Sequence, residues 1–161
     1  MFRWLVVVGF LLVSYVLTRL IPFSSYFRNV NTMIHELGHA VVALLTSGKV
    51  HHIVLNADHS GVTVAALSSG WSAFLVGLAG YITASLFAVW QFRVYYRRQE
   101  KRGLMIMSVI AALMLLLFVH EGFGVGWLIG FVVLNLLMWL IGGTVCRLYF
   151  LLVAFLSLEE S

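Results

Sequence analysis

Long apolar segments separated by short polar breaks dominate this chain of 161 residues. A helix needs about 20 apolar residues to cross a hydrocarbon core of ~30 Å, and about six segments approach or reach that length. They cover residues 4–21, 31–47, 70–92, 104–119, 127–141 and 144–158. The pattern therefore predicts an all-α polytopic membrane protein with about six apolar helices, forming one domain over residues 1–161.

The stretch at 49–66 breaks this pattern, because it is too polar to cross a membrane. Its β-forming residues fall into two groups on either side of a polar turn at 56–61, which predicts a small β-hairpin. The helix before it is expected to begin at Asn31 or Thr32 as N-cap and to end at Gly48. Residues 24–28 are expected to form a short polar turn.

Composition agrees with a membrane location. The chain is 62 % hydrophobic and 10 % charged, whereas soluble domains average about 25 % charged residues. Half of the Lys and Arg residues fall in the segment 93–103, which we interpret as a charged cytoplasmic loop. The net charge of +4 therefore indicates membrane orientation rather than nucleic-acid binding. The single cysteine, Cys146, excludes an internal disulfide and a Cys-based zinc cluster.

Small residues follow one face of the segment 70–92. Gly77, Gly80 and Ala84 are spaced at i, i+3 and i+7. Small side chains at this spacing let another helix approach closely in a membrane. We expect the segment 31–47 to be that partner.

The residues that carry chemistry lie in this partner segment. His35-Glu36-Leu37-Gly38-His39 is an H-E-x-x-H pattern, and chance placement in this composition gives only roughly 0.007 matches. On a helix, His35 and His39 share a face and can present two imidazoles to one Zn²⁺ ion. Glu36 lies beside that face, where it can act as the catalytic base instead of ligating the metal.

The sequence also allows other histidines as metal ligands and functions other than metal-dependent catalysis. His51, His52 and His59 lie in the predicted hairpin and could be ligands, although histidines in polar turns are usually solvated. The chain could instead be a catalytically inactive scaffold that binds membrane partners in the groove where a protease would bind its substrate. A metal-binding or transport protein could use His35 and His39 together with the hairpin histidines.

From His35 to Leu55 the chain resembles the site-2 protease family of intramembrane zinc metalloproteases, in its small bacterial and plant B-type branch. The matching features are H-E-L-G-H-A, then Ser47-Gly48-Lys49-Val50, and the β-forming residues that follow. The resemblance implies a core of three helices around Zn²⁺, with His35 and His39 as ligands and Glu36 as base. It also implies a transmembrane protein substrate presented as an extended strand, which we expect on the edge formed by Val50 to Leu55. A multi-pass location in a bacterial cell membrane and room for a regulatory membrane partner are implied as well.

The chain departs from that family at the third zinc ligand, which the family takes from an Asp on a later helix. The corresponding stretch begins at Asn135 and contains neither the Asp nor the Pro of the family pattern. Three alternatives follow: a ligand beyond Ser161 in a longer protein, substitution by Asp58 or Glu121, or an incomplete site. We expect the first.

Overall fold

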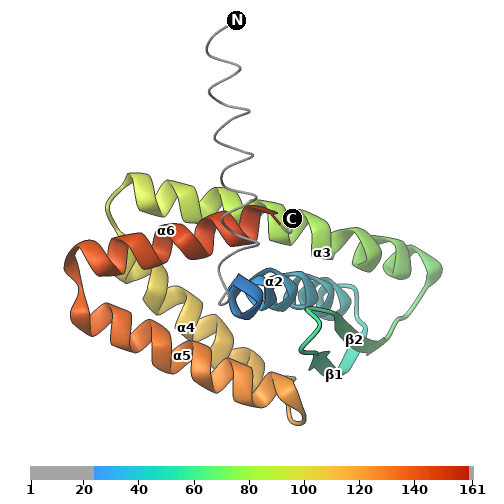
Figure 1. Cartoon of the computed structure of the whole chain (residues 1–161). Helices are drawn as coiled ribbons and strands as arrows, with labels where there is room; N and C mark the ends of the chain where they lie inside the picture. Colours follow the sequence, from blue (N-terminus) through green and yellow to red (C-terminus); the bar gives the residue numbers. More distant parts are fainter. Residues whose placement is uncertain (1–23, 160–161) are drawn as a thin grey trace, which may run out of the picture.

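The computed structural model describes residues 24–159, which form five helices and one two-stranded antiparallel sheet (Figure 1). The segment predicted at 4–21 lies outside the described residues. In chain order the elements are α2 (Ser24–Leu45), β1 (Lys49–Leu55), β2 (Gly61–Ala66), α3 (Gly70–Tyr96), α4 (Glu100–Leu117), α5 (Phe123–Ile141) and α6 (Gly143–Glu159).

The prediction of about six apolar helices is not supported. Among the described residues, two helices, α3 and α5, are long and apolar enough to cross a membrane by length and composition. Helix α6 is apolar but shorter. Helix α4 begins with three consecutive charged residues, and α2 carries the polar H-E-x-x-H motif, so neither is uniformly apolar.

Helix α2 lies in the middle of the molecule, with α3 and α6 on one side and the hairpin at one end (Figure 1). It begins at Ser24, so the predicted polar turn at 24–28 is instead its first turn. Tertiary packing explains the difference. Phe27 is buried, and Trp127 Nε1 donates a hydrogen bond to the Tyr26 carbonyl at 2.8 Å. Thr32 does not cap the helix, because its hydroxyl donates to the His59 carbonyl instead.

The predicted β-hairpin is confirmed. Strands β1 and β2 pair from Lys49–Ala66 to Leu55–Gly61, with an irregularity between Val50 and His52. The turn covers residues 56–60, because Gly61 already belongs to β2. Within the turn, the Ser60 hydroxyl and amide donate to Asp58 Oδ1 and lower the pKa of that carboxyl.

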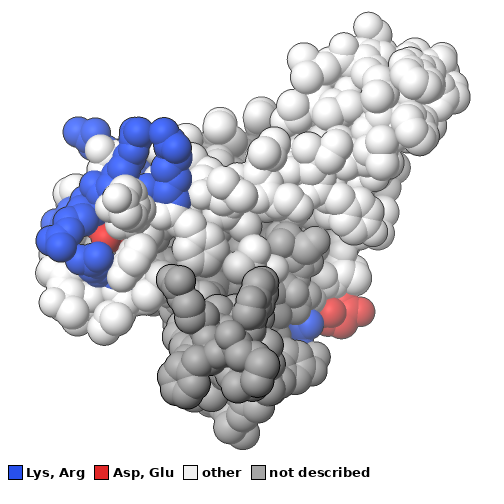
Figure 2. Space-filling view, turned by 90° about the horizontal axis from the view of Figure 1, so that it is seen from above, with Lys and Arg blue, Asp and Glu red and all other residues white. Residues whose placement is uncertain are grey.

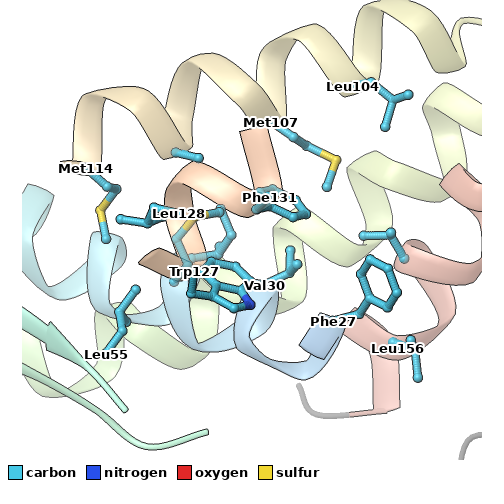
Figure 3. Packing of buried hydrophobic residues seen from close by; sticks show 14 of the residues in the cluster. Phe27, Val30, Leu55, Leu104, Met107, Met114, Trp127, Leu128, Phe131 and Leu156 are labelled. Atoms are coloured by element: carbon cyan, nitrogen blue, oxygen red, sulfur yellow. The ribbon is translucent and has the colours of Figure 1, made fainter. Parts of the chain in front are cut away.

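The apolar core lies where α4, α5 and α6 pack on the first turns of α2 (Figure 3). Large side chains fill it, and the rings of Trp127 and Phe131 stack with centroids 5.1 Å apart. The segment predicted as a loop at 93–103 is mostly helical. Helix α3 continues to Tyr96 and α4 starts at Glu100, so only residues 97–99 connect them.

Candidate metal centre

His35 and His39 lie one turn apart on α2, and their rings meet edge to face with centroids 4.6 Å apart. Together with Glu36 they form a group whose ligand atoms all lie within 4.8 Å of one another. His39 Nδ1 lies 2.6 Å from the carbonyl oxygen of Val76 on α3. A carbonyl only accepts, so Nδ1 carries the hydrogen and Nε2 keeps the lone pair that a metal requires.

The backbone of α3 passes directly beside these two nitrogens. A Cβ atom added to Gly80 would lie 2.6 Å from Nε2 of His35 and 2.6 Å from Nε2 of His39. The approach is reciprocal, because a Cβ added to Gly38 would lie 2.9 Å from the Ala79 carbonyl oxygen. The two glycines therefore let α2 and α3 cross closely enough for α3 to border the space in front of both imidazoles.

This crossing confirms that the small-residue face of α3 packs on the motif helix, with one exception. Gly80 and Ala84 are buried in the contact. Gly77 is exposed, and a Cβ added to it would meet nothing within 4 Å. The packing face therefore includes Gly80 and Ala84 together with the Val76 carbonyl, and Gly77 takes no part in it.

The hairpin covers Glu36 from the other side. Glu36 is 5 % exposed, and the Thr63 hydroxyl lies 2.6 Å from its Oε2 and 3.1 Å from its backbone carbonyl oxygen. A Cβ added to Gly61 would lie 2.6 Å from Cγ of Glu36. Strand β2 therefore holds the carboxylate by one hydrogen bond and by close contact.

Tyr81 borders the site from α3. Its ring meets that of His35 edge to face with centroids 4.7 Å apart, although the residue is 65 % exposed. Sequence reasoning missed the contributions of Tyr81, Thr63 and the Val76 carbonyl. The small-residue stripe on α3 pointed to this helix face, but no local signal marks Thr63, since its role depends on how the hairpin docks.

The remaining candidate ligands do not join the group. Among residues 24–159, the only cluster of three or more His, Cys, Asp and Glu side chains suited to a metal is His35, Glu36 and His39. The carboxylate of Asp58 is engaged by Ser60 in the hairpin turn. Glu121 lines a separate cavity of about 330 Å³ with His52 and His120. Neither Asp58 nor Glu121 is therefore a third ligand in this arrangement.

Three further residues named from the sequence have other surroundings. His51 is exposed, and the His59 carbonyl accepts a hydrogen bond from Thr32. Asn135 is fully buried and accepts a hydrogen bond from the Tyr149 hydroxyl at 2.7 Å. Asn135 therefore belongs to the packing of α5 against α6.

The donor set fits a zinc ion. Zinc is commonly bound by imidazole nitrogens and carboxylates, and a backbone carbonyl that fixes the tautomer of a ligating histidine is a usual accompaniment. Here the Val76 carbonyl fixes His39, and Gly80 leaves open the space that a side chain would fill. The assignment of His35 and His39 as ligands and of Glu36 as base stays a prediction, and the geometry supports it.

Comparison with known families decides the relationship. The sequence profile of the family described as peptidase M50B-like matches residues 4–159. The chain belongs to this family. The match confirms the predicted relationship to the site-2 proteases, which are membrane-embedded peptidases. The matched residues include the candidate metal centre and every described helix and strand. Neither the curated proteins nor the solved structures contain a match.

Proposed function

We propose that this chain is a membrane-embedded zinc endopeptidase that hydrolyses peptide bonds in or near transmembrane segments of other proteins. One observation carries the proposal. Two imidazoles with a shared open space at Gly80 stand beside a buried carboxylate, in a chain whose family is a peptidase family. A scaffold without catalytic activity would need neither the fixed tautomer of His39 nor a carboxylate held beside it.

His35 and His39 would hold the metal through Nε2. A bound zinc ion supplies Lewis-acid polarisation of a peptide carbonyl and makes a nearby water acidic enough to react near neutral pH. The chain itself supplies orientation. Val76 fixes the ring of His39, and Tyr81 packs against the ring of His35. Imidazoles constrained in this way lose little freedom when they bind a metal.

Glu36 would move the proton. Among the described contacts of its carboxylate, Oε2 accepts from Thr63, which leaves Oε1 to receive a proton from the attacking water. The same carboxyl group then returns that proton to the amine that leaves as the peptide bond breaks. The hydrogen bond from Thr63 orients the carboxylate for both transfers.

The substrate would have to be extended near the site, because a helix hides its peptide carbonyls within its own hydrogen bonds. The edge of β1 is partly occupied, since Ile53 N–H donates to the Phe118 carbonyl at 2.9 Å. Within the described chain, β2 has no backbone partner apart from β1. A substrate strand added to β2 would lie next to Thr63 and hence near Glu36. The free edge of β2 is therefore better suited than that of β1 to bind an extended substrate.

The test compares Glu36→Gln with Glu121→Gln in protein reconstituted with zinc and a panel of single-span membrane proteins. Gln has nearly the shape of Glu but accepts no proton, so cleavage should fall by about 10²–10⁴ while bound zinc is retained. Glu121 is exposed and lies outside the metal group, so its variant should cleave like the unaltered chain. Undiminished cleavage by Glu36→Gln would refute the mechanism, and an unaltered chain that binds zinc and cleaves nothing would favour a scaffold.

A further inference from the structure

Basic side chains gather at one end of the molecule, where α3 connects to α4. Figure 2 shows them at the left of its view, while most of the rest of that face carries no Lys or Arg. The cluster, named here the basic corner, consists of Arg93, Arg97, Arg98, Lys101 and Arg102, all of them exposed. It is not part of the metal centre and has no role in the proposed cleavage.

Nearby acids do not neutralise the basic corner. The nearest carboxylate, that of Glu100, is buried and forms a salt bridge with Arg147 Nε at 3.4 Å. Within the described part of the chain, no side chain of the basic corner itself forms a salt bridge. Lys101 also lies over the ring of Trp139, 5.2 Å from its centroid. The basic corner therefore presents its positive charge outward and should attract anions.

The surroundings place this cluster at a membrane interface. The same end of the molecule holds the end of α3, the start of α4, the end of α5 and the start of α6 (Figure 1). Aromatic rings lie at this level on α3 and α5. They belong to Trp90, Tyr95, Tyr96 and Trp139. One or two turns further along the helices, exposed apolar side chains follow. Among them are Leu86, Met105, Ile106 and Leu137. Basic, aromatic and then apolar is the order in which a membrane protein meets headgroups, interface and acyl chains.

The opposite end of the molecule lacks such a cluster in its described residues. There, where the hairpin meets the connection between α4 and α5, the charged side chains are Lys49, Asp58 and Glu121. The two ends of the molecule therefore differ in the number of charged side chains and in the sign of their net charge. It matches a bilayer that presents anionic headgroups to one end of the protein only.

The connection between α3 and α4 also has a suitable shape. Residues 97–102 line an open cleft of about 430 Å³. Arg98 lies in the left-handed region with φ 54°, where the chain turns from α3 into α4. Arginine binds phosphate oxygens through a planar fork of donors, which makes it better suited than lysine to this task.

We propose that the basic corner binds the phosphate group of anionic phospholipids in the leaflet around this end of the molecule. Acyl chains of the same lipids would lie along the exposed apolar faces of α3 and α4. The contact would hold the end of α3, and α3 carries Val76, Gly80 and Tyr81 of the metal centre. Lipid composition would then affect the position of α3 beside the two imidazoles.

The experiment measures the lipids retained by purified protein from bilayers of phosphatidylglycerol and phosphatidylcholine in equal amounts. The unaltered chain should retain phosphatidylglycerol preferentially. Arg97→Gln combined with Arg102→Gln should reduce that preference by about five-fold for each arginine, roughly 25-fold together. The matched variant with Lys at both positions keeps the positive charge but lacks the planar fork of donors, so its preference should lie between those of the unaltered chain and the double Gln variant. Lys49→Gln, at the opposite end, should leave it unchanged.

Two results would overturn the proposal. One is an undiminished preference for phosphatidylglycerol in the double Gln variant, because retention would then not depend on the basic corner. The other is complete loss of lipid preference in the unaltered chain on adding millimolar inorganic phosphate, which would show that the site recognises free phosphate instead. Equal thermal midpoints of all variants in phosphatidylcholine alone would establish that they fold alike, so a lost preference could be assigned to the side chains.

Discussion

Two regions of this molecule are held together in opposite ways. Where α2, α3 and the hairpin meet, glycines bring backbones together and hydrogen bonds place polar groups, as at Gly80 and Thr63. Where α4, α5 and α6 meet, large apolar side chains such as Phe131 and Phe150 are fully buried and supply most of the contact. The first region should be sensitive to added atoms and the second to lost ones, because one depends on close approach and the other on filled volume.

The largest effect on stability is expected from Phe131→Ala. Phe131 is 0 % exposed and stacks on Trp127, and its loss leaves a cavity that should reduce the free energy of unfolding by about 3–5 kcal/mol. Bound zinc per folded molecule should stay unchanged, since this ring is not part of the metal group. Denaturant unfolding in micelles measures the first quantity and metal analysis the second.

The matched control is Phe123→Ala on the same helix, where the ring is 44 % exposed and its removal should cost much less. Loss of zinc by a still folded Phe131→Ala protein would contradict the separation of the two regions.

Gly80→Ala should have the opposite effect to Phe131→Ala and should change zinc binding, because it adds one carbon atom to the first region. The new Cβ would lie 2.6 Å from both imidazole Nε2 atoms, so the metal space closes or α3 must move away. Supporting positions around a zinc site usually affect affinity by about 10–100-fold, and a direct obstruction should reach at least the upper end. Zinc affinity measured by competition with a chelator tests this.

Gly77→Ala, one turn earlier on α3, controls for the change in helix propensity. Its Cβ would meet nothing within 4 Å, so zinc affinity should not change. Equal affinities of the Gly80→Ala and Gly77→Ala proteins would show that α3 does not border the metal space.

The sequence predicted the parts of both regions that follow from local spacing. The i, i+4 spacing of His35 and His39 placed two imidazoles together, and the β-forming residues around 56–61 gave the hairpin. Helix limits were less accurate. The start of α2 was missed because Tyr26 and Phe27 are helical only by virtue of long-range contacts such as that with Trp127. The basic residues of segment 93–103 favour a loop in a sequence-based prediction, although α3 continues to Tyr96 and α4 already starts at Glu100.

The missed parts of the site depend on docking between elements far apart in sequence. Thr63 reaches Glu36 only because the hairpin folds back over α2, a contact across 27 positions. The carbonyl of Val76 reaches His39 across 37 positions. No spacing rule in one sequence predicts such registers. The small residues of α3 gave the helix face, but the one glycine that borders the imidazoles was identified from the structure.

The smallest expected effect, and the most specific one, comes from Thr63→Val. Valine keeps the shape of threonine and removes the hydroxyl that donates to Glu36 Oε2 at 2.6 Å. A hydrogen bond to a charged group contributes about 1.5–3 kcal/mol. We therefore expect kcat to fall by about ten-fold, with KM and bound zinc unchanged, because the hydroxyl orients the base and contacts neither metal nor substrate.

Rescue separates positioning from general structure. Thr63→Ser lacks the β-branch but restores a hydroxyl at the same place, so it should recover most of kcat. A Ser variant as impaired as the Val variant would show that the hydroxyl is not what orients Glu36. Val64→Ala, on the exposed side of the same strand, should leave kcat unchanged. If Thr63→Val instead raised KM at constant kcat, the hydroxyl would contribute to substrate binding along β2. The hairpin would then serve the substrate alone, and Glu36 would be oriented by α2 itself.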